Sequence, residues 1–233
     1  MHVEIGAAKA AKYATRESGD TVEIIERPHG GLSVVLVDGQ SSGRGAKMIS
    51  NIVARKAIAL LGEGVRDGAA ARAAHDYLRT HRGSQVSAEL QIVSVDLASR
   101  TLVVSRNARC AAYLVRQGNL TVLDAASEAI GIHAHTKPVI VELPIEPDTY
   151  VVAVSDGVCA AGARHGAPLD VAGAITLRVG AHPTGQALAD ALLDAALAAD
   201  DYRPADDVTV VVTAVRPEDV PHDVRRLSAS LPV

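Results

Sequence analysis

Four short motifs place aspartates beside apolar, β-rich segments of this chain. They are Gly19-Asp20, Asp38-Gly39, Ser155-Asp156-Gly157 and Asp206-Asp207-Val208-Thr209. A carboxylate beside a buried strand is costly unless something compensates its charge. Several converging carboxylates also repel one another and raise one another's pKa. Asp-Gly alone is a common turn dipeptide, so the inference rests on the set of four rather than on any single motif.

Hard divalent cations would resolve this repulsion, because Mg²⁺ and Mn²⁺ prefer carboxylate, carbonyl and water oxygens. A glycine after the acid lets the backbone approach the metal and frees its carbonyl to serve as a ligand. Two such ions about 3.5–4 Å apart can lower the pKa of a bridging water and clamp a phosphoryl group. The set therefore indicates metal-dependent phosphoryl hydrolysis without a protein nucleophile.

Apolar runs bounded by turn residues predict the strands that carry these motifs. Residues 21–27 and 32–37 form two β-like runs around a Gly-containing turn, which predicts a hairpin. The second run has no polar alternation, so both of its faces should be covered. Similar runs predict further strands at 90–97, 102–105, 111–115, 120–123, 139–143, 150–154 and 208–215.

Apolar residues at helical spacing predict helices at 46–61, 69–81, 169–177 and 186–198. Strands occur early, in the middle and at the end, with helices in blocks between them. This order favours an α+β fold of mostly antiparallel sheets flanked by helices. No linker rich in Pro, Gly or Ser divides the chain, so we predict one domain over 1–215 and a polar tail over 216–233.

Composition excludes several classes of function. The 233 residues include no Phe, no Trp and only five Tyr, so Val, Ile, Leu and Ala must fill the core. The net charge is -4 with scattered basic residues, which argues against a nucleic-acid partner. No apolar segment reaches the roughly 18 residues that span a membrane. We therefore expect a cytoplasmic protein with no membrane partner.

The two cysteines, Cys110 and Cys159, are far apart in the sequence and lack CxxC spacing. Neither a disulfide framework nor a zinc site is therefore expected. Cys159 lies in the apolar run Val-Cys-Ala-Ala, which predicts a buried, inert thiol.

In this order, the motifs resemble those of the metal-dependent protein phosphatase (PP2C-like) family, in the compact bacterial branch related to the sporulation-stage-II-E phosphatase domain. The similar segments extend over roughly residues 5–215. Besides the four acidic motifs they include the loop Asp38-Gly39-Gln40-Ser41-Ser42-Gly43, Asn107-Ala108-Arg109 and Ile130-Gly131-Ile132. The resemblance implies a four-layer α-β-β-α sandwich, in which helix pairs flank two antiparallel sheets.

The resemblance also implies two metal ions, Mn²⁺ or Mg²⁺, at one edge of the sandwich. By position, Asp38 would bridge both ions. The other metal-site residues are Asp20 and the Gly39 carbonyl for one ion, Asp156 and Asp206 for the other, and Asp207 in support. Asp20, Asp38, Asp156 and Asp206 would form the catalytic set.

The implied activity is that of a protein serine/threonine phosphatase. Its partner would be a phosphorylated bacterial signalling protein, such as an anti-sigma factor antagonist, as for short stand-alone stress-response phosphatases. Eukaryotic members hold phosphate with an arginine near the first acid. Arg16 lies in that neighbourhood, but we do not assign it this role.

Two departures from the family pattern leave a second hypothesis open. Gln40, Ser41 and Ser42 replace the usual Gly-containing loop, and Arg109 replaces a Gly that would tolerate positive φ. A catalytically inactive phosphatase-fold module that binds a phosphoprotein remains the alternative, although all four acidic motifs are intact.

Other enzyme classes lack their signatures. A dehalogenase-like phosphatase needs Asp-x-Asp, whereas Gly39 and Gln40 follow Asp38. Gly43-Arg44-Gly45 lacks the full dinucleotide fingerprint and the lysine of a P-loop. A serine hydrolase would need a Gly-x-Ser-x-Gly elbow, which the sequence does not contain.

Overall fold

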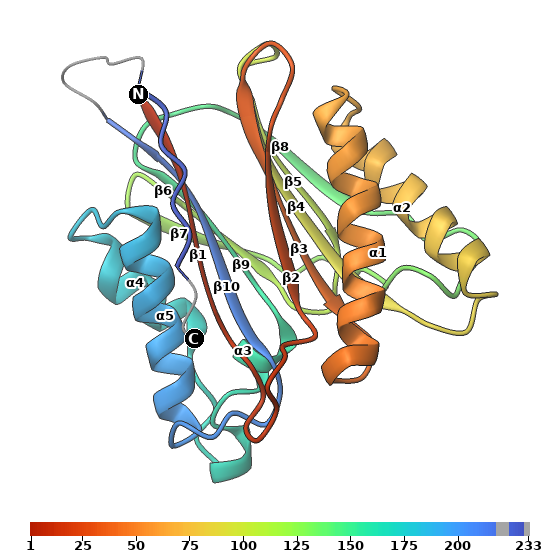
Figure 1. The fold of residues 1–233 in the computed structure, drawn as a ribbon. Helices are drawn as coiled ribbons and strands as arrows, with labels where there is room; N and C mark the ends of the chain where they lie inside the picture. Colours follow the sequence, from red (N-terminus) through yellow and green to blue (C-terminus); the bar gives the residue numbers. More distant parts are fainter. Residues whose placement is uncertain (218–223, 231–233) are drawn as a thin grey trace.

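Two five-stranded antiparallel sheets lie face to face in a computed structural model that describes residues 1–217 and 224–230 (Figure 1). The first sheet has the order β1 (His2–Ala10), β10 (Val208–Arg216), β9 (Thr149–Val154), β6 (Ala112–Arg116) and β7 (Asn119–Leu123). The second has the order β2 (Thr21–Glu26), β3 (Gly31–Gly39), β4 (Ala88–Asp96), β5 (Thr101–Asn107) and β8 (Val139–Pro144).

A pair of helices covers the outer face of each sheet (Figure 1). α1 (Gly43–Gly62) and α2 (Asp67–His81) cover the second sheet, and α4 (Val171–Val179) and α5 (Gly185–Ala199) cover the first. A short helix, α3 (Asp156–Ala160), lies at the lower end of the sandwich in Figure 1. The four-layer α-β-β-α sandwich with antiparallel sheets is therefore confirmed.

The apolar run of β3 shows why both faces of the central strands are covered. Val35 and Val37 point into the core beneath α1 and α2, whereas Val34 and Leu36 point into the core between the sheets. Successive side chains of a strand alternate between its faces, so an uninterrupted apolar run can serve two cores at once. This arrangement confirms the expectation from the sequence.

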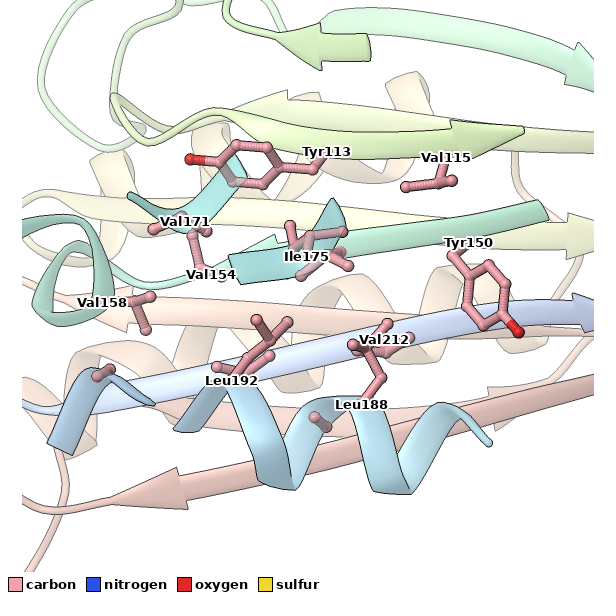
Figure 2. Close-up of a cluster of buried hydrophobic side chains, with 14 of the residues drawn as sticks. Tyr113, Val115, Tyr150, Val154, Val158, Val171, Ile175, Leu188, Leu192 and Val212 are labelled. Carbon is pink, nitrogen blue, oxygen red and sulfur yellow. The ribbon is translucent and has the colours of Figure 1, made fainter. Parts of the chain in front are cut away.

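The third core lies between the first sheet and its helices. Figure 2 shows Leu188 and Leu192 of α5 and Ile175 of α4 among the apolar side chains of the sheet, including Val212. Tyr150 reaches the border of this core, where its hydroxyl donates to the Pro183 carbonyl at 3.1 Å. Aliphatic side chains thus fill the interior, as the composition predicts.

Two elements were not predicted from the sequence. β1 pairs with β10 along its whole length, although Gly6 and its alanines weaken the β pattern. A side chain at Gly6 would come within 2.2 Å of the Gly185 backbone, so the glycine lets α5 approach the strand. α3 was missed because Ser155-Asp156-Gly157 is typical of a turn, yet in the structure this motif begins the helix.

The polar tail begins at the end of β10. Arg216 still belongs to this strand and pairs with Glu4 at 3.0 Å. Residues 224–230 are exposed, and Arg225 pairs with Glu26 at 2.6 Å. Residues 218–223 and 231–233 of the tail lie outside the described residues, so the boundary at 215 stays a prediction. None of the described helices combines the length and apolar character that crossing a membrane requires.

Candidate metal centre

Strand pairing brings the four acidic motifs to one edge of the sandwich. Thr21 pairs with Val37, so Asp20 just before β2 lies beside Asp38 near the end of β3. Val210 pairs with Val154 in the other sheet, so the residues before β10 meet the start of α3. The ends of both sheets thus carry the acids to a common edge, which lies near α3 in Figure 1.

Asp20 is fully buried where the two sheets meet. Its Oδ2 accepts a hydrogen bond of 2.5 Å from Thr209 Oγ1 in β10, whereas its Oδ1 has no partner among the described residues. Burial raises the pKa of Asp20 to about 7, against the effect of the hydrogen bonds from Thr209 and Ser155. An unpartnered buried carboxylate oxygen is the kind of atom that a cation would satisfy.

Asp38 and Asp156 influence each other's pKa at the centre of the cluster. Burial raises the pKa of Asp38 to about 9, and the charges of Asp20 and Asp156 raise it further. The pKa of Asp156 is also raised, first by burial and then by the charge of Asp206. Without a cation, these carboxylates need protons to coexist.

The side chains do not form a finished metal cage. Within residues 1–217 and 224–230, no three acidic, histidine or cysteine side chains converge in a geometry that could hold an ion. The orphaned Asp20 oxygen and the raised pKa values of Asp38 and Asp156 nevertheless indicate an acid cluster without sufficient positive charge. This donor set fits hard divalent cations, and binding would release the protons.

Two glycines of the motifs allow backbones to approach one another closely. A side chain at Gly39 would come within 2.2 Å of the Ala46 carbonyl oxygen, so this glycine lets α1 pack against the end of β3. A side chain at Gly157 would come equally close, 2.2 Å, to the carbonyl oxygen of Asp207. The glycines therefore have packing roles in addition to any exposure of a carbonyl to a metal.

Asp207 holds the loop that precedes Asp20. Its Oδ2 accepts from the Gly19 backbone N–H at 2.8 Å, and its Oδ1 accepts from the Lys12 backbone N–H at 2.9 Å. Both oxygens are thus engaged, which favours the supporting role over direct ligation. Its neighbour Asp206 faces the cavity described next.

An open cavity of about 750 Å³ lies over the acid cluster. Its acidic lining comprises Asp38, Glu89, Glu128, Asp156 and Asp206, and its basic lining comprises Lys12, Arg109 and His133. Asp20 is not part of the lining, because it lies beneath the surface of the cavity. A second cavity of about 170 Å³ between β7 and β8 contains none of the acid cluster.

Sequence reasoning missed Glu89. This residue of β4 lies directly opposite Asp38 in the strand register and is almost fully buried. Its carboxylate accepts from Arg109 Nε at 2.7 Å and from the Arg109 backbone N–H at 3.2 Å. Glu89 lies one residue before the strand predicted at 90–97, and only the β3–β4 register reveals what lies opposite it.

The two unusual loops are accommodated differently. Arg109 does not have positive φ, so the strain expected at this position is absent. Ser41 does have φ of 79°, a region that disfavours side chains. The neighbouring Gln40 fixes this loop, because its Oε1 accepts from the Ser87 backbone N–H at 2.8 Å.

The prediction for Cys159 was wrong. Both cysteines are free, and Cys110 is buried, but Cys159 is exposed on α3. The apolar run around it misled the prediction, because Val158 takes the buried side of this short helix. The two thiols share a hydrogen bond, which raises the pKa of Cys110 and lowers that of Cys159.

Comparison with known families identifies the class of protein. The family model described as "Stage II sporulation protein E (SpoIIE)" matches residues 28–216. The chain belongs to the SpoIIE family. The match includes three of the four acidic motifs, and Gly19-Asp20 precedes it.

Solved structures agree on a PP2C-type phosphatase fold. The PP2C phosphatase domain of SpoIIE from Bacillus subtilis, with a fragment of its regulatory domain, has a TM-score of 0.79 at 22% identity, and the match covers 92% of this chain and 64% of that one. The RsbU and RsbW domains of a Mycobacterium tuberculosis protein have a TM-score of 0.74 at 18% identity. This match covers 92% of this chain and 60% of that one.

The Mycobacterium tuberculosis serine/threonine phosphatase PstP/Ppp has a TM-score of 0.70 at 17% identity, over 93% of this chain and 100% of that one. A further PstP structure contains two manganese ions. The SpoIIE and RsbU–RsbW structures are longer, and this SpoIIE-family chain spans less than two thirds of each. A search of curated proteins gave no significant match.

Proposed function

We propose that this SpoIIE-family protein is a metal-dependent protein serine/threonine phosphatase. The observation that carries the proposal is the acid cluster, in which burial raises the pKa of Asp38 and Asp156 beside an Asp20 oxygen that has no partner among the described residues. Such a cluster is short of positive charge and lies under a cavity open to a large substrate. Bound Mn²⁺ or Mg²⁺ would supply Lewis acidity toward the phosphoryl oxygens and the attacking water.

The protein's own residues would have distinct tasks. Asp38 would hold both ions, with Asp20 and the Gly39 carbonyl on one side and Asp156 and Asp206 on the other. Asp207 would keep the loop at Gly19 in place through its two backbone hydrogen bonds. Because the pKa values of Asp38 and Asp156 are raised, these carboxyls must lose protons before they bind a cation, so metal occupancy should rise with pH.

We further propose that the substrate is a phosphoserine or phosphothreonine in a bacterial signalling protein, such as an anti-sigma factor antagonist. The open cavity suits a phosphorylated segment of a protein better than an enclosed pocket would. The likeness to the RsbU and RsbW domains supports a regulatory partner. A regulator of this kind would be cytoplasmic, so we propose the same location for this protein.

A catalytically inactive module that binds a phosphoprotein is the second candidate. Arg109 favours it, because its Nη2 lies 3.8 Å from Asp156 and neutralises part of the charge that would attract a metal. Such a module would bind its partner equally well in a chelator.

Hydrolysis of p-nitrophenyl phosphate with MnCl₂, with MgCl₂ or with EDTA tests the main proposal. We expect metal-dependent release that EDTA abolishes and that Asp38→Ala eliminates without unfolding. Asp201→Asn is the matched control, because Asp201 is an exposed aspartate outside the cavity. Normal turnover by Asp38→Ala would overturn the metal assignment. A folded wild type that hydrolyses neither this ester nor a phosphopeptide would favour the binding module.

A further inference from the structure

Three basic side chains face the acidic cavity: Lys12, Arg109 and His133. Arg16, the arginine nearest the first acid, is exposed and does not line the cavity. A phosphate monoester carries up to two negative charges, so it needs positive partners in a cavity with five acidic side chains. Arg109 is the only guanidinium among the lining residues, and guanidinium groups bind phosphate with paired hydrogen bonds.

Arg109 is fixed at one end and open at the other. Its backbone N–H and its Nε both donate to Glu89, at 3.2 and 2.7 Å. Its side chain is nevertheless 77% exposed, and the ion pair of Nη2 with Asp156 is long, at 3.8 Å. The hydrogen bonds of Arg109 within the described residues therefore leave its Nη groups available to a ligand in the cavity.

Glu89 holds the Arg109 guanidinium next to the acid cluster. Glu89 lies on β4 directly opposite Asp38 on β3, and only 8% of it is exposed. A buried carboxylate that engages Nε restricts the plane of the guanidinium, and its hydrogen bond raises the pKa of Arg109. Arg109 therefore remains cationic. Its Nη2, which Glu89 does not engage, lies beside Asp156.

Resting on the proposed function, we propose that Arg109 binds the nonbridging oxygens of the substrate phosphoryl group through its Nη groups, with Glu89 as its positioning residue. Arg109, the last residue of the Asn107-Ala108-Arg109 motif, would thus recognise the phosphoryl group in this protein. Its ion pair with Asp156 would loosen as that carboxylate turns to a cation, which frees Nη2 for the phosphate.

Binding of inorganic phosphate provides a test that does not need turnover. Isothermal titration of the Mn²⁺-loaded protein should give a Kd for phosphate that Arg109→Gln weakens about 10- to 100-fold, the usual cost of losing hydrogen bonds to a charged group. Arg109→Lys should recover only part of the affinity, because an ammonium cannot donate in pairs. Arg16→Gln is the matched control and should leave the Kd unchanged.

Steady-state kinetics with a phosphopeptide then separate the possible roles. Arg109→Gln should raise KM in parallel with the Ki of phosphate, while the Mn²⁺ concentration needed for half-activation stays constant. Glu89→Gln should raise the same KM by a smaller factor, because it loosens the arginine without removing it. If Arg109→Gln instead tightens Mn²⁺ and leaves the Kd for phosphate unchanged, Arg109 competes with the metal and the inference is wrong.

Failure of the proposed function gives a different pattern. A wild type that does not hydrolyse phosphopeptide but binds phosphate through Arg109 would be a binding module, and the inference would stand. Equal phosphate affinity in wild type and Arg109→Gln overturns the inference, whatever the activity.

Discussion

At the scale of single residues, the raised pKa of Asp38 predicts how stability depends on pH. The folded pKa of Asp38 is about 9, far above its value of 3.8 in a model compound. The folded state therefore holds a proton that the unfolded chain releases above pH 4. This contribution to stability is fully present below about pH 4 and is lost as the pH rises toward 9.

Asp38→Asn removes this titration while it keeps the size and a hydrogen-bond donor. In EDTA, the Tm of the wild type should fall more steeply between pH 5 and 9 than that of Asp38→Asn. At pH 8 the variant should be the more stable of the two. Thermal unfolding followed by circular dichroism across this pH range would measure both Tm values. If the Tm of the wild type and that of Asp38→Asn change with pH in parallel, the raised pKa of Asp38 is contradicted.

Ser41 offers a second test at this scale, because its φ of 79° disfavours any side chain. Ser41→Gly should stabilise the protein by about 0.5–1 kcal/mol, or roughly 1–4 °C in Tm. Ser42→Gly is the matched control, since Ser42 has φ of -142° and gains nothing from glycine. Urea denaturation of both variants measures the difference. A destabilised Ser41→Gly would show that its side chain has a structural role.

The corrected position of Cys159 predicts its reactivity. The exposed Cys159 thiol, whose pKa is lowered by the hydrogen bond from Cys110, should react with iodoacetamide well before the buried Cys110. Mass spectrometry of a time course under native conditions would give both rates. Cys159→Ser should keep turnover within a few-fold of the wild type, and a complete loss without unfolding would point to a thiol mechanism.

The sequence predicted the acids of the site but not their partners. The four acids Asp20, Asp38, Asp156 and Asp206 belong to recognisable motifs beside apolar runs. Their residue type and their order in the chain were therefore enough to predict them. Glu89 and Arg109 meet only through strand pairing and loop geometry. A local pattern carries no information about the residue across a strand pair unless the register is already known.

At the scale of elements, long apolar runs were predicted well and glycine-rich ones were not. β3 and β10 were recognised because Val and Leu fill them, with Ile completing other strands. β1 contains Gly6 and three alanines, and it becomes a strand because β10 and α5 cover it. Tertiary contacts thus override weak local preference at this edge of the sheet.

Gly6 tests this account of β1. Gly6→Ala places a side chain within 2.2 Å of the Gly185 backbone, so α5 must move away from the strand. We expect a loss of more than about 2 kcal/mol in the free energy of unfolding. Gly45→Ala is the matched control, because this glycine of α1 has open space around it and alanine favours a helix. Equal urea midpoints for the two variants would refute the close approach.

At the scale of the whole molecule, the metal centre lies where the two sheets are joined. Asp20 and Asp38 belong to the second sheet, whereas Asp156 and Asp206 adjoin strands of the first. The hydrogen bond from Thr209 to Asp20 already links the sheets at this edge. A cation held by acids from both sheets would replace the repulsion between them with attraction, so occupancy and global stability should be coupled.

This coupling predicts stabilisation by metal that does not depend on catalysis. A ligand that binds only the folded state at 100 times its Kd contributes about 2.7 kcal/mol. For a chain of this length the Tm should then rise by roughly 5–11 °C when Mn²⁺ replaces EDTA at pH 8. Asp38→Ala should stay folded but lose most of the shift, whereas Asp201→Asn should keep it. If Asp38→Ala shows the full shift, the stabilising ion binds elsewhere. If the wild type shows none, the acid cluster keeps its protons instead of a metal.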